Sequence, residues 1–284
     1  MRRIFRNENT IYFFLLPSLL GLALFYLIPF AISIYYASID NITARNFVGA
    51  ANLIATWNTP AFRLAIRNTA LFMGISIPLS MVLALLLALL LRPMGKRTRR
   101  FLAVFFLLPL VIPSGSMVFF WRHFLAVNGV LNRVFSPVAP IDWLNSPYAM
   151  LCVIAIFIWK NVGFNMILFQ AGLGSIPKEY YEFAQTEGAG RLRQFRLVTL
   201  TYLGPTFLLV FIMSVVNSFK VFREIYLLTG THPSRNIYLL QHFVNNQFAN
   251  LNYQLMVGAA FYVFGFVFVL VLALYRLQQR QVYI

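Results

Sequence analysis

The chain of 284 residues is 60% hydrophobic and only 11% charged, yet it carries a formal net charge of +16. This apolar share exceeds the roughly half-apolar usage of soluble domains, and the apolar residues form runs of about twenty or more, the length at which a helix crosses a bilayer. The composition therefore excludes an ordinary soluble domain and predicts an all-α membrane protein. Because Cys152 is the only cysteine, an internal disulfide and a CxxC metal or redox site are also excluded.

Six apolar segments are predicted to cross the membrane as helices. They cover residues 11–37, 64–91, 101–120, 148–170, 200–222 and 255–275. The first follows three arginines, as the core of a signal peptide would. Its apolar stretch is much longer than the roughly 7–15 residues of such a core, however, and no small-residue cleavage site follows it. We interpret it as a retained anchor, and residues 1–284 as a single transmembrane domain.

The distribution of Lys and Arg predicts the orientation of the chain. Three lie before the first segment, five in residues 92–100, four in the loop 171–199 and two in the tail, so that fourteen of the 23 fall on alternating loops. Cytoplasmic loops carry an excess of Lys and Arg, so both termini and the loop 171–199 are expected in the cytoplasm. The basic residues also suit contact with anionic membrane lipid. No basic face interleaved with stacking aromatic residues is found outside the predicted segments, so nucleic acid is not an expected partner.

The loop 171–199 contains the segment EYYEFAQTEGAGRLRQFRLV, in which six of twenty residues are charged. At about 3 kcal/mol for each charge at a helix centre, inserting it in the membrane would cost on the order of 18 kcal/mol. Ser175 is predicted to be the N-cap of a short helix with Pro177 in its first turn. Gly188 and Gly190 permit the positive φ that ends this helix and reverses the chain. The resulting amphipathic helix–turn–helix suits either docking into a groove of a soluble partner or lying flat on lipid headgroups.

The same segment, extended to EYYEFAQTEGAGRLRQFRLVTLTYLGP, resembles the EAA loop of ABC importer permeases. Glu182 stands at the glutamate of that motif and Ala184 at its second alanine, and Gly188 and Ala189 match its Gly-Ala pair. The sequence departs from the motif at the first alanine, where Phe183 stands.

The resemblance extends over nearly the whole chain and is specific to the carbohydrate-importer branch, the maltose-type first permease subunit. The other segments that carry it are FVGAANLIATWNTPAFRLAIRNTALF, NGVLNRVF, IDWLNSPYAM, IWKNVGFNMILFQAGLGSIP and FREIYLLTG. Residues 228–236, LTGTHPSRN, depart from the LTxGGP pattern expected there. The resemblance implies the type I ABC importer permease fold, with six transmembrane helices and a cytoplasmic coupling helix. The function it implies is to form half of the translocation path for a sugar, oligosaccharide or sugar-like solute in an ATP-driven, binding-protein-dependent importer.

The resemblance also implies coupling residues and partners. The residues expected to couple the chain to an ATPase are Tyr180, Glu182, Phe183, Ala184, Glu187, Gly188 and Ala189. The chain has no GxxxxGKS or GxxxxGKT phosphate-binding loop, so no cofactor is expected in it, and ATP and Mg²⁺ would be bound by the partner ATPase. The expected partners are a second permease subunit, a pair of ATP-binding subunits and an extracytoplasmic solute-binding protein, in the cytoplasmic membrane of a prokaryote.

Polar residues inside two predicted segments are candidates for the solute path. Asn161 and Asn165 are four residues apart in the fourth segment and therefore lie on one helix face, and Ser214 and Asn217 form a similar stripe in the fifth. Polar groups in lipid are costly and usually face a cavity or a partner helix. Amides beside aromatic rings suit sugar hydroxyls, but hydrogen bonds that hold helices together use the same residue types. The residues alone leave both roles open.

Two other classes of function remain to be weighed. An intramembrane enzyme would need a metal or nucleophile set, and the three histidines show no HExxH spacing, so neither a catalytic nor a metal site is expected. The alternative is a self-sufficient secondary transporter or channel, a class that typically uses buried carboxylates for ion coupling. All seven acidic residues fall in predicted loops or at the ends of predicted segments, which argues against proton coupling.

Overall fold

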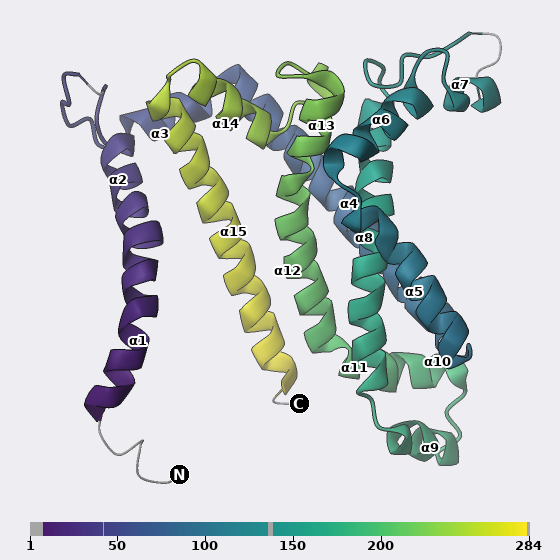
Figure 1. The fold of residues 1–284 in the computed structure, drawn as a ribbon. Helices are drawn as coiled ribbons and strands as arrows, with labels where there is room; N and C mark the ends of the chain where they lie inside the picture. The colour runs from purple at the N-terminus through teal and green to yellow at the C-terminus, as the bar shows by residue number, and fades with distance from the viewer. Residues whose placement is uncertain (1–7, 42, 136–138, 283–284) are drawn as a thin grey trace. The chain divides into compact units, whose positions relative to one another are not determined.

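The computed structural model describes residues 8–41, 43–135 and 139–282. Over these ranges the regular structure is helical, apart from an isolated antiparallel bridge between Ile39 and Phe47 (Figure 1). The chain divides into two compact units. The first comprises Met1–Arg63 with Val244–Phe264, and the second comprises Leu64–Phe243 with Gly265–Ile284.

The N-terminal span of the first unit contains a short π-helical turn. The elements of this unit are α1 Glu8–Leu22, the π-helical turn η2 Ala23–Leu27, α2 Ile28–Ala37, α3 Ala51–Asn58 and the start of α15 Tyr253–Val282. The turn η2 ends two residues before Pro29. A proline ring clashes with the carbonyl four residues earlier in a regular helix, and the wider π turn is placed where this clash would occur. The span therefore stays helical through Pro29.

Close packing holds α3 against the start of α15 within the first unit. The hydroxyl of Tyr262 donates to the carbonyl oxygen of Leu53 at 3.1 Å, and its ring centre lies 5.6 Å from that of Trp57. A side chain at Gly258 would overlap the hydroxyl of Thr56. Only glycine therefore permits this approach of the two helices.

Helix α8 occupies the centre of the second unit. The helices of this unit include α4 Pro60–Leu91, α5 Lys96–Val111, α6 Ser114–Leu125, α7 Val130–Phe135, α8 Ala149–Gly174, α12 Gly204–Lys220, α13 Phe222–Thr229 and the start of α14 Leu240–Ala249. α8 packs against both α5 and α12. A side chain at Gly163 would overlap the carbonyl of Phe106 in α5, so this glycine allows the two backbones to approach closely.

Two apolar cores flank α8 along its length. In the first, the rings of Phe157 and Phe72 meet edge to face at 5.4 Å between centres. In the second, the ring of Phe169 lies 5.0 Å from that of Phe207. Edge-to-face pairs of this kind add to the stabilisation from burial alone. The cores hold α4, α8 and α12 together.

Five helices in the described part of the chain are long and apolar enough to cross a membrane. They are Phe14–Ala37, Pro60–Leu91, Ala149–Gly174, Gly204–Thr229 and Tyr253–Ala273. Each lies over a segment predicted from the sequence. The predicted segment 200–222 is displaced the most, because its helix begins at Gly204 and the span continues to Thr229.

The predicted segment 101–120 is not one straight helix. Two helical stretches, Lys96–Val111 and Ser114–Phe135, meet there at an angle of 92°. Pro113 explains the break, because proline disfavours the helical conformation of the residue before it, and Ile112 is accordingly extended, with φ −63° and ψ 128°. The described chain reaches six spans only if this bent pair is counted as one span.

Candidate functional site

A short helical hairpin between α8 and α12 contains the expected coupling residues (Figure 1). It consists of α9 Lys178–Thr186, α10 Arg191–Gln194, the π-helical turn η3 Phe195–Thr199 and α11 Leu200–Tyr202. The N-cap position of α9 is Pro177, so the prediction that Ser175 caps this helix is wrong. The hydroxyl of Ser175 instead donates to the carbonyl oxygen of Gly172 at 2.8 Å, at the C-terminal end of α8. A serine between two helices can cap the end of the first or the start of the second, and Ser175 caps the end of α8.

The turn of this hairpin depends on one glycine. Gly188 has φ +72°, as the sequence predicted. Its N–H donates to the carbonyl oxygen of Gln185 at 3.0 Å, and the N–H of Ala189 donates to that of Ala184 at 2.9 Å, the pair of bonds that closes a helix around a left-handed residue. Gly190 has φ −65° and is the N-cap of α10, so a positive φ at that position is not found. Only Gly188 therefore requires glycine for its backbone conformation.

The outer face of the hairpin presents large apolar side chains among charged ones. Phe183 is 67% exposed and Tyr180 46%, and Leu192 of α10, which was not among the expected residues, is 82% exposed. The other expected coupling residues range from exposed to buried: Glu182, Glu187 and Gly188 are exposed, Ala184 is half-buried and Ala189 is buried. Exposed aromatic anchors ringed by charges are typical of surfaces that dock another protein.

Two tyrosines attach α9 to the rest of the second unit. The hydroxyl of Tyr181 lies 2.9 Å from Oγ1 of Thr199 and accepts a hydrogen bond from Nη1 of Arg92 at 3.2 Å. The guanidinium of Arg92 also lies 4.8 Å from the centre of the Tyr181 ring. The rings of Tyr180 and Tyr202 are 4.7 Å apart, and a hydrogen bond between the two side chains raises the pKa of Tyr202 to about 12. Polar contacts thus contribute to the position of this helix.

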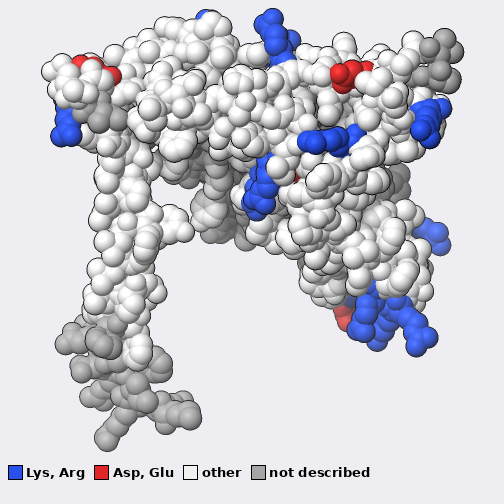
Figure 2. All heavy atoms as spheres, turned by 45° about the horizontal axis from the view of Figure 1, so that its top comes forward, with Lys and Arg blue, Asp and Glu red and all other residues white. Residues whose placement is uncertain are grey.

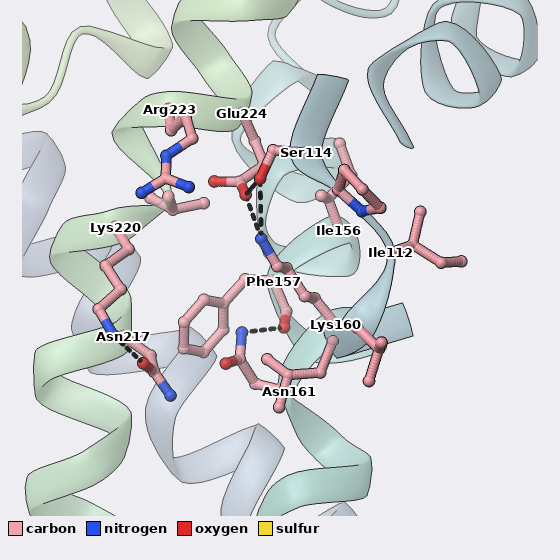
Figure 3. Close-up of a pocket in the computed structure, with 14 residues that line it drawn as sticks. Ile112, Ser114, Ile156, Phe157, Lys160, Asn161, Asn217, Lys220, Arg223 and Glu224 are labelled. Carbon is pink, nitrogen blue, oxygen red and sulfur yellow. Dashed lines mark hydrogen bonds and ion pairs between the residues drawn. The ribbon is translucent and has the colours of Figure 1, made fainter. Parts of the chain in front are cut away.

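A second site is a cavity of about 270 Å³ inside the second unit. It is bounded by the bend between α5 and α6, by α8, and by the end of α12 with the start of α13 (Figure 3). Its polar lining residues are Ser114, Lys160, Asn161, Asn217, Lys220, Arg223 and Glu224. Three of these side chains are cationic and one is acidic, so the lining is positive overall. Such a cavity can bind a solute that carries hydroxyl or acidic groups.

Lys160 of α8 forms an ion pair with Glu224 of α13 at this cavity (Figure 3). Glu224 is only 3% exposed, and its carboxylate also accepts a hydrogen bond from the hydroxyl of Ser114 at 3.0 Å. Nζ of Lys160 lies 3.4 Å from the same hydroxyl. The three side chains therefore join α6, α8 and α13 at the bend. Because a buried charge without a partner is strongly unfavourable, the buried carboxylate of Glu224 requires Lys160, whose side chain is partly exposed.

The structure places the four predicted path residues in two different settings. Asn161 and Asn217 line the cavity. Asn165 and Ser214 are not among the lining residues: Nδ2 of Asn165 lies 3.0 Å from Oγ of Ser214 and 3.1 Å from Oγ of Ser80. These contacts connect α8 to α12 and to α4. A spacing of four residues along α8 therefore did not place both asparagines in one site.

The sequence did not identify Glu224 as a residue of the site. It lies two residues beyond the predicted segment 200–222, and the acidic residues were all expected in loops or at segment ends. The span continues to Thr229, so this carboxylate lies inside it, and for Glu224 that expectation is wrong. Lys160 was the available signal, because an ionisable residue within an apolar segment usually has a partner. Ser114 gave no signal of its own beyond its position after Pro113.

Together the fold and the cavity define a membrane transport component. Residues 76–283 match the family described as binding-protein-dependent transport system inner membrane component, and the chain belongs to this family. It is therefore a multi-pass inner-membrane permease subunit of an ABC importer. This membership decides against the alternative of a self-sufficient secondary transporter or channel.

The chain is similar to known permeases over most of its length. It is 28% identical over 207 residues to the lactose transport system permease protein LacF of Rhizobium radiobacter, which covers 70% of each chain. It is 30% identical over 258 residues to the sulfoquinovosyl glycerol transport system permease protein SmoG of Agrobacterium fabrum, which covers 84% of this chain and 81% of the relative. A crystal structure of a bacterial ABC transporter involved in the import of the acidic polysaccharide alginate matches 95% of both chains with a TM-score of 0.81 at 23% identity. The predicted ABC importer permease fold is thereby confirmed.

Proposed function

We propose that this permease forms half of the translocation path of an ATP-driven importer for a sugar, an oligosaccharide or a sugar-like solute. The observation that carries the proposal is the cavity at the bend between α5 and α6, which presents amide, hydroxyl and charged groups between largely apolar helices. Sugar hydroxyls both donate and accept hydrogen bonds, and a mixed lining of this kind satisfies both. The names of the relatives, which transport lactose and sulfoquinovosyl glycerol, support the same class of solute.

Within the cavity, Asn161 and Asn217 are the residues that we expect to contact the solute. Asn161 lies one residue after Lys160 in α8, and Oδ1 of Asn217 accepts a hydrogen bond from Nζ of Lys220 at 3.1 Å (Figure 3). Lys220 and Arg223 add positive charge at the same cavity, which favours solutes with an acidic group. Asn165 and Ser214 are expected to act less directly, by holding α8 against α12.

We also propose that α9 docks the ATPase that supplies the energy. Phe183 and Tyr180 would provide the apolar anchor, Glu182 a polar contact, and Gly188 the turn that sets the angle of the hairpin. The complex would be completed by a second permease subunit, a pair of ATP-binding subunits that hold ATP and Mg²⁺, and an extracytoplasmic solute-binding protein. The hairpin and both termini would then face the cytoplasm, and the two units would act as one transmembrane domain in the lipid.

Replacing the aromatic anchor tests this proposal. In the purified importer, Phe183→Ala should weaken ATPase association about tenfold, because an aromatic hot spot contributes roughly 1–2 kcal/mol or more, and Glu182→Ala should have a smaller effect. Phe135→Ala is the matched control, since Phe135 of α7 is 69% exposed. Stimulation of ATP hydrolysis by solute-loaded binding protein is the second measurement. Equal ATPase association in the two phenylalanine variants would contradict the docking role of α9.

A further inference from the structure

A second cavity, of about 300 Å³, lies beside the hairpin at the end of the second unit. Its walls come from the end of α4, the start of α5, the end of α8 and the first residue of α9. Arg92, Arg99 and Lys178 line it, and none of its lining residues is acidic. Figure 2 shows the dense group of Lys and Arg side chains that gathers over this end of the unit. The cavity therefore has a concentrated positive charge.

One polar group in the wall of this cavity lacks a partner. Nε2 of Gln170, near the end of α8, is buried and has no hydrogen-bond partner among the described residues. A buried N–H donor without an acceptor is unfavourable, and because Gln170 lines the cavity, a rotation of its side chain would present this donor to a bound acceptor. Arg99 is itself half-buried. The cavity thus combines positive charge with an unused donor, which is the arrangement of an anion site.

We propose that this cavity binds a phosphate group, carried either by an anionic lipid headgroup or by a soluble phosphate. A phosphate offers several acceptor oxygens, which suit the two guanidinium groups, the ammonium group of Lys178 and the Gln170 amide. Leu173 and Ile176, which are both buried, give the cavity an apolar side that suits the carbon atoms behind a lipid headgroup. A basic pocket between membrane helices at the bilayer surface is a known setting for such a headgroup.

The occupied cavity would also fix the position of the hairpin. Arg92 lines the cavity and at the same time holds Tyr181 of α9, and Lys178 is the first residue of that helix. A bound phosphate would restrain both contacts. This consequence, unlike the binding itself, rests on the proposed role of α9 in docking the ATPase: phosphate at this site would strengthen the coupling of hydrolysis to transport.

The experiment uses the complete importer in nanodiscs and two double variants. Arg99→Gln with Lys178→Gln removes two cations from the cavity. Arg97→Gln with Arg100→Gln removes two cations of the same basic stretch that line a separate hollow with Lys96. Two probes are measured: phosphatidylglycerol retained from a phosphatidylcholine mixture, and radiolabelled inorganic phosphate bound in pure phosphatidylcholine. Binding of the first identifies a lipid source and binding of the second a soluble one.

The expected result is binding of at least one probe, weakened about tenfold or more in the cavity variant and less than about threefold in the control variant. The proposal is overturned if neither probe binds, or if the two double variants bind equally, because that result indicates diffuse surface attraction. Solute-stimulated ATP hydrolysis by the unaltered complex is measured in parallel. Its absence would refute the proposed function, whereas normal hydrolysis with equal probe binding would refute this site alone.

Discussion

Lys160 and Glu224 form an ion pair across the central cavity, although each comes from a different membrane span. The carboxylate is almost completely buried, and Ser114 at the start of α6 donates a hydrogen bond to it. The pair therefore holds three helices together at the point where α5 and α6 bend. The two charges of this pair neutralise each other, so Lys220 and Arg223 supply the net positive charge of the cavity.

Breaking this pair from one side is expected to destabilise the subunit. Lys160→Met should lower the free energy of unfolding by about 3–5 kcal/mol, because Glu224 stays buried without its partner. Glu224→Gln should lower it less, because the side chain of Lys160 is 19% exposed. The double variant should be more stable than either single variant. Thermal unfolding of the purified complex measures this effect. Lys220→Met is the control, because Lys220 is exposed and its hydrogen bond is to a neutral amide; a loss equal to that of Lys160→Met would contradict the prediction.

The turn of the hairpin allows a comparison of two neighbouring glycines. Gly188→Val should be strained by roughly 1–2 kcal/mol, because an L-residue with a branched side chain is unfavourable at positive φ. Gly190→Val should be tolerated, since its φ is −65°, and an added Cβ meets no atom within 4 Å at either position. Both proteins should insert in the membrane. ATPase association and solute uptake should fall only in the first, and equal behaviour of the two would show that the turn does not set the docking geometry.

The two asparagines of α8 are expected to fail in different ways. Asn161→Leu should raise the KM for transport or lower its rate while the complex still assembles, because it removes a polar group from the cavity. Asn165→Leu should reduce the yield and thermal stability of the complex, by about 1–3 kcal/mol, because it leaves two buried hydroxyls without a partner. Uptake assays beside size-exclusion profiles separate these outcomes. A selective transport defect in Asn165→Leu with normal assembly would contradict this prediction and indicate that Asn165 contacts the solute.

The burial of His242 leads us to expect a loss of stability in mild acid. Its ring is fully buried, and burial lowers the pKa to about 4 from an ordinary 6.5. Between these values the unfolded chain binds a proton that the folded chain does not. Stability should therefore be intact above pH 6.5 and fall as the pH drops through 6.5 towards 4, by roughly 3 kcal/mol in all. Unfolding temperatures measured between pH 7.5 and 4.5 test this expectation. His242→Gln should remove most of the slope, and an unchanged slope would assign it to other groups.

Patterns that repeat along a helix were predictable from the sequence, and single contacts between distant segments were not. Five apolar segments formed spans because their length and composition allow little else. Gly188 was predictable because a charged segment outside the membrane must turn, and a left-handed residue at a helix end is usually glycine. Pro113 was visible in the sequence, but prolines occur within other spans of this chain, as Pro78 does in α4, so its presence did not by itself predict a bend.

The candidate site was harder to predict because its residues come from five elements. Asn161 and Asn165 share a helix face, yet which of them meets a cavity depends on what α4, α5 and α12 place opposite. Glu224 was left out of the predicted site only because its segment was predicted to end at residue 222. The ends of predicted segments are less certain than the segments themselves. The partner that Lys160 requires was therefore present in the sequence, two residues outside the predicted boundary.

The 92° bend between α5 and α6 has a consequence for how this kind of permease can change its solute. A helix end leaves backbone carbonyl and amide groups without partners inside the helix, and Leu110, Val111 and Ile112 at the end of α5 line the central cavity together with Ser114. Main-chain carbonyl groups are kept in every substitution, and N–H groups in every substitution except proline. The bend can therefore supply a constant set of hydrogen-bonding groups, against which the side chains of α8 and α12 are free to vary and select a different solute.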